Sequence, residues 1–201
     1  MQRHLGIALA ISTGLAGLGA TTAASAADCP RFEIVDVITG PECQSGTLSI
    51  RPKAISETLD YVAGEVQCPT GSSRAFVWWG AGEIEFLPFP EGTIESYVND
   101  INDQGVIVGC ARIADSGFST HAFRYDSVTG DMDLFAADGS TGNEAEAINK
   151  YGQIVGWSAP GAAFLWEGEE IVWLDQYLPA GNDYSQARDI SDTGYIVGSF
   201  Y

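Results

Sequence analysis

The sequence predicts an all-β protein whose short-stranded sheets are arranged as the blades of a small propeller. One phrase occurs four times, as AISETLDYVAG, DINDQGVIVG, AINKYGQIVG and DISDTGYIVG. Its closing glycines, Gly64, Gly109, Gly156 and Gly198, are 45, 47 and 42 residues apart. A period in this range is typical of stacked supersecondary units, and four short antiparallel strands in about 45 residues describe one propeller blade.

The second copy, about residues 96–136, shows the strand plan most clearly. Its predicted strands are residues 96–101, 106–108, 121–125 and 132–135. Asn102 and Asp103 predict a turn between the first two strands, because their side chains bond to nearby backbone groups, and Gly105 supplies a positive φ. The β-branched run that follows this turn favours a returning strand.

The other copies repeat this plan with two departures. The third copy (about residues 144–179) predicts strands at residues 145–148, 153–155, 163–166 and 171–174. The first copy (about residues 47–88) matches in its second half, where it predicts strands at residues 74–78 and 84–87. The first copy has one extra residue in its turn and lacks the glycine that the others hold as Gly105, Gly152 and Gly194. The fourth copy (residues 186–201) stops after two strands. We expect the turn glycines and the closing glycines to be structural.

Residues 32–38 form an additional strand-like segment before the first copy. The segment is similar to the fourth strand of a blade, so we predict that it completes the blade begun by residues 186–201. Such closure removes exposed sheet edges and gives four blades. The alternative is an incomplete array, in which the chain is a fragment or a short relative of a longer protein.

Each complete copy places two aromatic residues two positions apart in its third strand. These pairs are Phe76 and Trp78, Phe123 and Tyr125, and Phe164 and Trp166. The spacing puts both rings of a pair on one face of the strand. Because the pairs recur in every unit, we predict that they pack in the core between blades. A sugar-binding platform is the functional alternative.

The first 27 residues predict an export signal. A basic start at Arg3 and His4 precedes a short apolar stretch, and an A-x-A pattern at residues 24–26 marks a cleavage site. A membrane anchor is the alternative, but the apolar stretch is short for a span. We expect one monomeric domain over residues 28–201 that is not inserted into a membrane. Its expected location is extracellular or periplasmic, after Sec-type export.

All four cysteines, Cys29, Cys43, Cys68 and Cys110, lie after the predicted signal. In an exported protein this favours two disulfides, which can be connected in three ways. We favour Cys29 with Cys43, and Cys68 with Cys110 because both of these follow closing glycines of neighbouring copies. Buried free thiols are the alternative. A zinc site is disfavoured, since no C-x-x-C spacing occurs.

The chain is strongly acidic, with 27 Asp and Glu against 9 Lys and Arg and a formal charge of −18. This argues against nucleic acid and anionic lipid as partners, since both need basic patches. His121 is the one histidine after the signal and lies inside a predicted strand, and the sequence contains no G-x-S-x-G elbow and no phosphate-binding loop. We therefore predict no catalytic residues.

The sequence contains candidate residues for two further kinds of site, for calcium and for sugar cleavage. Residues 100–105 and 189–194 are similar to an oxygen-rich calcium loop, but position 12 counted from Asp100 is Ala111, where an EF-hand needs an acid. We predict no cofactor and no metal, and leave open only a looser calcium site. Acidic residues in the predicted loops are candidate carboxylate pairs for cleaving sugars. They are Glu91, Glu95, Asp138, Glu144, Glu146 and Asp183.

The repeated phrase, the triplet His121-Ala122-Phe123 and the aromatic residue two places on resemble the HAF-repeat family of bacterial extracellular proteins. The phrase I-N-x-x-G-x-[IV]-V-G is complete in the second and third copies, and Ser191 replaces its asparagine in the fourth. The resemblance covers roughly residues 32–201.

The resemblance implies export and a propeller-like β fold. It brings no settled activity, so it transfers no site residue to this chain. The first and third copies have Arg74 and Ala162 at the position of His121, which weakens any shared chemistry for this histidine.

Together these patterns predict a secreted binding or structural module at the cell surface or in the medium. The expected ligand is a polysaccharide or an extracellular protein, held by loops. The predicted binding loops are residues 89–94, 112–120 and 179–184. The alternative is a carbohydrate-active enzyme, a hydrolase or lyase, that uses the loop carboxylates.

Overall fold

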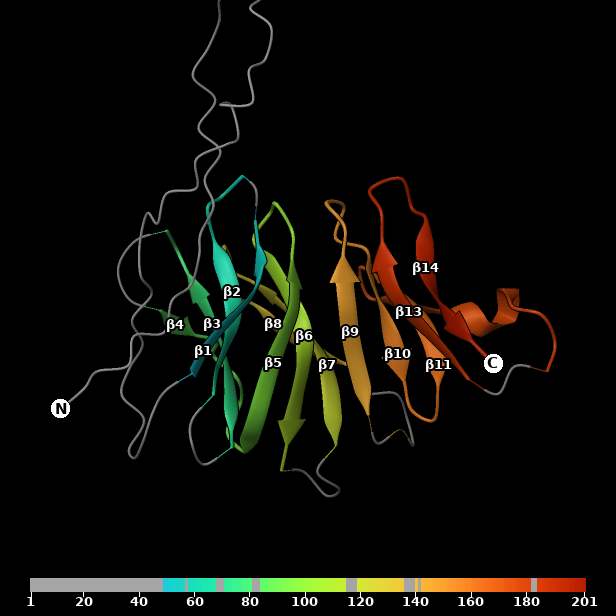
Figure 1. Cartoon of the computed structure of the whole chain (residues 1–201), viewed down its shortest axis with the longest axis horizontal. Helices are drawn as coiled ribbons and strands as arrows, with labels where there is room; N and C mark the ends of the chain where they lie inside the picture. The colour runs from blue at the N-terminus through green and yellow to red at the C-terminus, as the bar shows by residue number, and fades with distance from the viewer. Residues whose placement is uncertain are drawn as a thin grey trace, which may run out of the picture.

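The computed structural model describes most of the chain after residue 48. The described residues are 49–56, 58–67, 71–80, 84–114, 119–135, 140, 142–181 and 184–201. Several predictions fall outside them: the signal (residues 1–27), the N-terminal strand (residues 32–38), Cys29, Cys43, Cys68, Asp138 and Asp183. Within the described part the protein consists of four antiparallel sheets and one short 3-10 helix (Figure 1). The predicted all-β class is confirmed.

Three sheets have four strands each, and every strand pairs with its neighbour in the chain. Sheet 1 contains β1 (Ser49–Ile55), β2 (Val62–Gln67), β3 (Ser73–Trp78) and β4 (Glu85–Phe86). Sheet 2 contains β5 (Thr93–Ile101), β6 (Val106–Ile113), β7 (Thr120–Asp126) and β8 (Met132–Phe135). Sheet 3 contains β9 (Asn143–Ile148), β10 (Ile154–Ser158), β11 (Ala162–Glu167) and β12 (Glu170–Trp173). The helix η1 (Leu174–Tyr177) then leads to sheet 4, which has β13 (Ser185–Ile190) and β14 (Ile196–Phe200).

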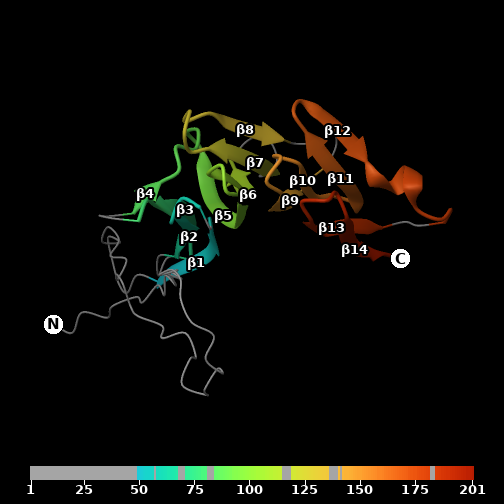
Figure 2. The same ribbon diagram turned by 90° about the horizontal axis from the view of Figure 1, so that it is seen from above.

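The four sheets lie side by side along an arc (Figure 2). Their first strands, β1, β5, β9 and β13, line the inner side of this arc, and β4, β8 and β12 lie on the outer side. Each copy of the repeated phrase forms the turn between the first two strands of a sheet, so these turns share one axial end of the arc.

The turns use a left-handed residue at equivalent places. Gly105, Gly152 and Gly194 have φ values of 80°, 80° and 81°. In the first copy Asp60 takes this role, with a φ of 54°. Aspartate tolerates the left-handed region better than most residues, so the first turn forms without the glycine.

The closing glycines allow the inner strand to approach closely. At each of them the pairing with the inner strand shifts register, which marks a β-bulge. A Cβ atom on Gly109 would lie 2.0 Å from the carbonyl oxygen of Tyr97, and one on Gly156 would lie 1.9 Å from that of Glu144. Phe123 stands opposite Gly109 in the next strand, so its ring covers the space that a side chain would fill.

The paired aromatic residues lie in the core. All six are at most 7% exposed, so they do not form a ligand-binding surface. Phe123 and Tyr125 of sheet 2 pack against sheet 1, and Phe164 and Trp166 of sheet 3 pack against sheet 2. The corresponding pair of sheet 1, Phe76 and Trp78, packs in a separate cluster with Val62, Val66 and Ile84.

Candidate ligand-binding site

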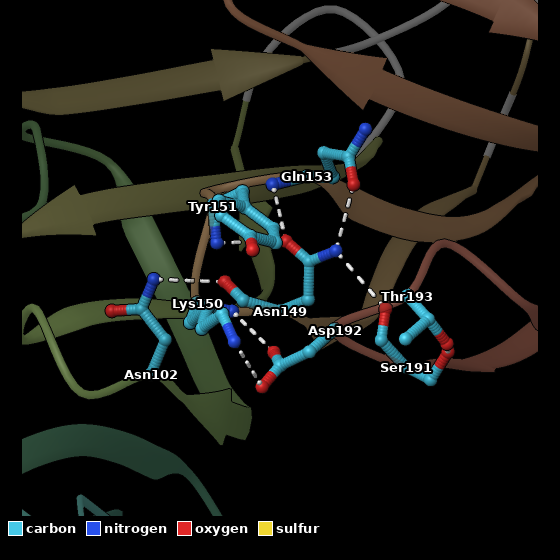
Figure 3. A network of polar contacts seen from close by, with 8 residues as sticks. All are labelled: Asn102, Asn149, Lys150, Tyr151, Gln153, Ser191, Asp192 and Thr193. Carbon is cyan, nitrogen blue, oxygen red and sulfur yellow. Dashed lines mark hydrogen bonds and ion pairs between the residues drawn. The ribbon is translucent and has the colours of Figure 1, made fainter.

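Polar side chains connect the turns of neighbouring sheets (Figure 3). The Asn149 carboxamide oxygen accepts hydrogen bonds from the backbone N–H groups of Tyr151 (3.0 Å) and Gln153 (3.1 Å). Its amide nitrogen donates to the Ser191 carbonyl of sheet 4 at 3.2 Å. Asn102 of sheet 2 makes the equivalent bond to the Asn149 carbonyl at 3.1 Å. The asparagine of the repeated phrase therefore caps its own turn and links two sheets.

The aspartates of the calcium-like segments have the same structural use. Asp100 accepts the backbone N–H of Ile148 in sheet 3 (2.9 Å), and Asp103 accepts that of Thr58 in sheet 1 (3.3 Å). Asp192 accepts the N–H of Lys150 (3.1 Å). Across the part of the chain that the structure describes, no group of three or more His, Cys, Asp or Glu side chains is placed to hold a metal ion.

A cavity of about 470 Å³ is lined by strands of sheets 1, 2 and 3. Glu95 and Tyr97 line it from the first half of β5, and Glu144 lines it from the start of β9. Because the connecting turns follow the other ends of these strands, these three residues lie toward the axial end of the arc that is remote from the turns.

Equivalent positions of the three sheets supply the lining. Glu65, Cys110 and Trp157 each follow a closing glycine, on β2, β6 and β10 respectively. Because successive side chains of a strand alternate between faces, this position is presented at the same place in each sheet. Three sheets with the same strand plan therefore contribute three different side chains to one cavity.

The Glu65 carboxylate is the most deeply placed charge of the cavity, since its side chain is 3% exposed. One oxygen, Oε1, lies 3.9 Å from an Arg51 nitrogen and 3.8 Å from Lys53 Nζ. The other oxygen, Oε2, is buried without a hydrogen-bond partner in the described structure. Burial raises the pKa of Glu65, and the charges of Lys53 and Arg51 partly offset this effect.

The remaining carboxylates near the cavity have partners. Glu95 pairs with Arg112 at 3.1 Å, and Glu144 accepts a hydrogen bond from Asn99 at 3.0 Å. Glu146 lies just beyond the lining, where it accepts the Trp157 indole N–H at 3.0 Å and pairs with Arg188. Burial and then the nearby Glu144 raise the pKa of Glu146.

Cys110 corrects one sequence-based prediction. Its thiol is buried and free, so the expected Cys68–Cys110 disulfide is not formed in the structure. Cys110 is one residue after its closing glycine, and the residue at that place in sheet 1 is Glu65, whereas Cys68 follows the end of β2. Burial and then the nearby glutamates raise the pKa of the Cys110 thiol well above its ordinary value, which keeps it protonated and a poor nucleophile.

Some of the predicted site residues line the cavity, and others lie elsewhere in the structure. Glu95 and Glu144 line the cavity, as do Arg112 and Thr120, the two ends of one predicted loop. Glu91 lies instead on a second hollow of about 410 Å³, which residues 89–94 line beside the β4–β5 connection. The loop that begins at residue 179 follows η1 at the other end of the described chain.

His121 lies on β7 opposite Ala111 and is not part of the cavity lining. Sequence reasoning missed Glu65, Lys53, Tyr97 and Trp157. The signal that points to Glu65 and Trp157 is the change of residue type directly after each closing glycine, in a phrase that is otherwise repeated.

No family model matches this chain, and no curated protein matches it at a significant level. Among the described residues, none of the helical structure has the length and apolar character that a membrane span requires.

Proposed function

We propose that the protein is an exported binding module whose inner cavity holds part of a saccharide. The observation that carries this proposal is the mixed lining of the cavity, in which the half-buried rings of Tyr97 and Trp157 lie among charged and amide side chains. Aromatic faces suit the apolar faces of sugar rings, and a few fixed polar groups orient a ligand. The volume of about 470 Å³ is in the range of small-ligand sites.

A binding screen tests the proposal directly. The purified protein is melted in the presence of a panel of polysaccharides, and a ligand that binds only the folded state raises the melting temperature. Trp157→Ala should abolish the shift produced by the active glycan. Tyr177→Ala is the matched control, since Tyr177 is 73% exposed on η1 and lies outside the cavity. Equal shifts in both variants would place the ligand elsewhere, and calcium and EDTA arms show whether a metal contributes.

An extracellular protein is the second class of ligand for such a module, and a purely structural role is the third. A glycan panel that leaves the melting temperature unchanged would favour these two. The resemblance to HAF-repeat proteins and the signal-like residues 1–27 support export. Sequencing the N-terminus of the secreted protein tests export, because removal of the predicted signal should leave residue 27 or 28 as the first residue.

A carbohydrate-active enzyme is the alternative function, and Glu65 is the observation that favours it. A carboxyl group whose pKa is raised by burial can act as a general acid, and Glu144 and Glu95 offer a second carboxylate in the same cavity. In an enzyme, Glu65→Gln would abolish the release of reducing ends from the bound glycan, while Glu169→Gln on the exposed β11–β12 turn would not. Absence of any release by the unmodified protein supports the binding module.

We also propose that the chain closes as a four-bladed propeller, with residues 32–38 completing sheet 4. The arc of sheets and the exposure of β14 support this, since Val197 is 59% exposed and Phe200 is 49% exposed. The equivalent residue of Val197 in sheet 3, Val155, is fully buried against the next sheet. Deletion of residues 28–38 should lower the melting temperature and increase amide exchange in β14. Unchanged exchange there would favour an open array.

A further inference from the structure

We propose that the cavity selects a saccharide that carries a free primary amine, and that the ammonium group of this sugar pairs with Glu65. The inference rests on the saccharide-binding function proposed above and names the class of sugar. An ammonium group offers three hydrogen-bond donors, and a donor is what the Oε2 oxygen of Glu65 lacks in the structure.

The buried carboxylate is incompletely compensated by its own protein. Both nearby cations, Arg51 and Lys53, approach the same oxygen, and their distances of 3.9 and 3.8 Å exceed the length of a hydrogen bond. The second oxygen of Glu65 has no partner in the described structure. A buried oxygen without a hydrogen bond is costly, so a ligand that donates to Oε2 gains more than it would at an exposed glutamate.

The side chains that line the cavity carry a net negative charge, and Arg51, outside the lining, is the one further cation near Glu65. Three lining glutamates (Glu65, Glu95 and Glu144) face two lining cations (Lys53 and Arg112), which leaves the lining one charge negative. Arg112 is already paired with Glu95. The formal charge of the whole chain, −18, extends this preference to long range. Polysaccharides rich in uronic acid or sulfate are therefore disfavoured.

The uncharged part of the lining fits the rest of an amino sugar. Tyr97 and Trp157 line the cavity, and aromatic rings attract ammonium groups as well as sugar rings. Asn99 and Thr120 supply neutral hydrogen-bonding groups for hydroxyls. A bare amine would leave these groups unused, so the site fits an aminated sugar better than a simple cation.

Calorimetric titration with a matched pair of ligands tests the inference. The ligands are a glucosamine tetramer and the same tetramer with every amine acetylated, at a pH where the free amines are protonated. We expect the free-amine tetramer to bind about tenfold more tightly, because acetylation removes one charge-assisted hydrogen bond. Glu65→Gln should abolish this preference, and Glu169→Gln should preserve it. If Glu65→Gln fails to fold, Glu144→Gln should reduce the preference.

The other outcomes separate the two proposals. Equal binding of both tetramers, lost in Trp157→Ala, would overturn the amine preference and leave saccharide binding in place. Binding of neither tetramer, with a neutral polysaccharide active in the screen, would lead to the same conclusion. Binding of tetralysine with no binding of any sugar would overturn both proposals, since it would show recognition of ammonium groups without recognition of a saccharide.

Discussion

Replacement of Gly109 by alanine should destabilise the protein strongly, although it adds a single methyl group. The new Cβ would lie 2.0 Å from the Tyr97 carbonyl oxygen and 3.0 Å from the Phe123 ring. Carbon and oxygen atoms approach comfortably at about 3.3 Å, so β5 has to move by roughly 1.3 Å. Overpacking of this kind costs about 1–3 kcal/mol, and a disturbed strand ladder adds about 1 kcal/mol for each hydrogen bond lost.

The expected total is about 2–4 kcal/mol, which lowers the melting temperature of a domain of this size by about 5–15 °C. Circular dichroism melts of the variant measure this directly. Gly142→Ala is the matched control, because its Cβ would meet nothing closer than Ala159 at 3.8 Å. A Gly109→Ala variant that melts within a degree or two of the unmodified protein would refute the close approach at the bulge.

Three further predictions concern the turns, the buried acids and the free thiol. Asn149→Ala should cost about 2–3 kcal/mol in chemical denaturation, because four hydrogen bonds are lost. Burial raises the pKa values of Glu65 and Glu146 above their ordinary 4.5, so the folded state holds protons more tightly than the unfolded chain. Their contribution to stability is therefore lost as pH rises through the raised values. The melting temperature should be higher at about pH 5 than at about pH 7.5, with a smaller difference in Glu65→Gln. Cys110 should react with iodoacetamide after denaturation and not before, as mass spectrometry of its peptide will show.

Much of the strand plan was predictable because local rules determine it. The strand over Met132–Phe135 has the predicted bounds, and the turns at Gly105 and Gly152 have the backbone geometry that their sequence requires. The predicted strand at residues 106–108 proved longer, since β6 continues to Ile113. A β-branched run marks where such a strand begins, whereas its end depends on pairing with β5 and β7.

The cavity was only half predictable, because it depends on how separate sheets converge. Glu95 and Glu144 were found as acids in loops, although both lie in strands. Glu65 was missed because the change of residue type after each closing glycine shows that the position varies, but not that the three side chains face one space. The predicted Cys68–Cys110 disulfide was wrong because two residues that both follow a closing glycine need not occupy equivalent positions of their strands. Cys68 is four residues beyond Gly64, whereas Cys110 is one residue beyond Gly109.

The residue directly after each closing glycine differs between the sheets, whereas the glycine and the bulge recur. In sheets 1, 2 and 3 a closing glycine and the bulge opposite it stand directly before this position. Glutamate, cysteine and tryptophan occupy that position in three sheets of one chain. Under the proposed saccharide-binding function, exchange of these three side chains, one in each sheet, is expected to change the ligand preference without altering the closing glycines and bulges.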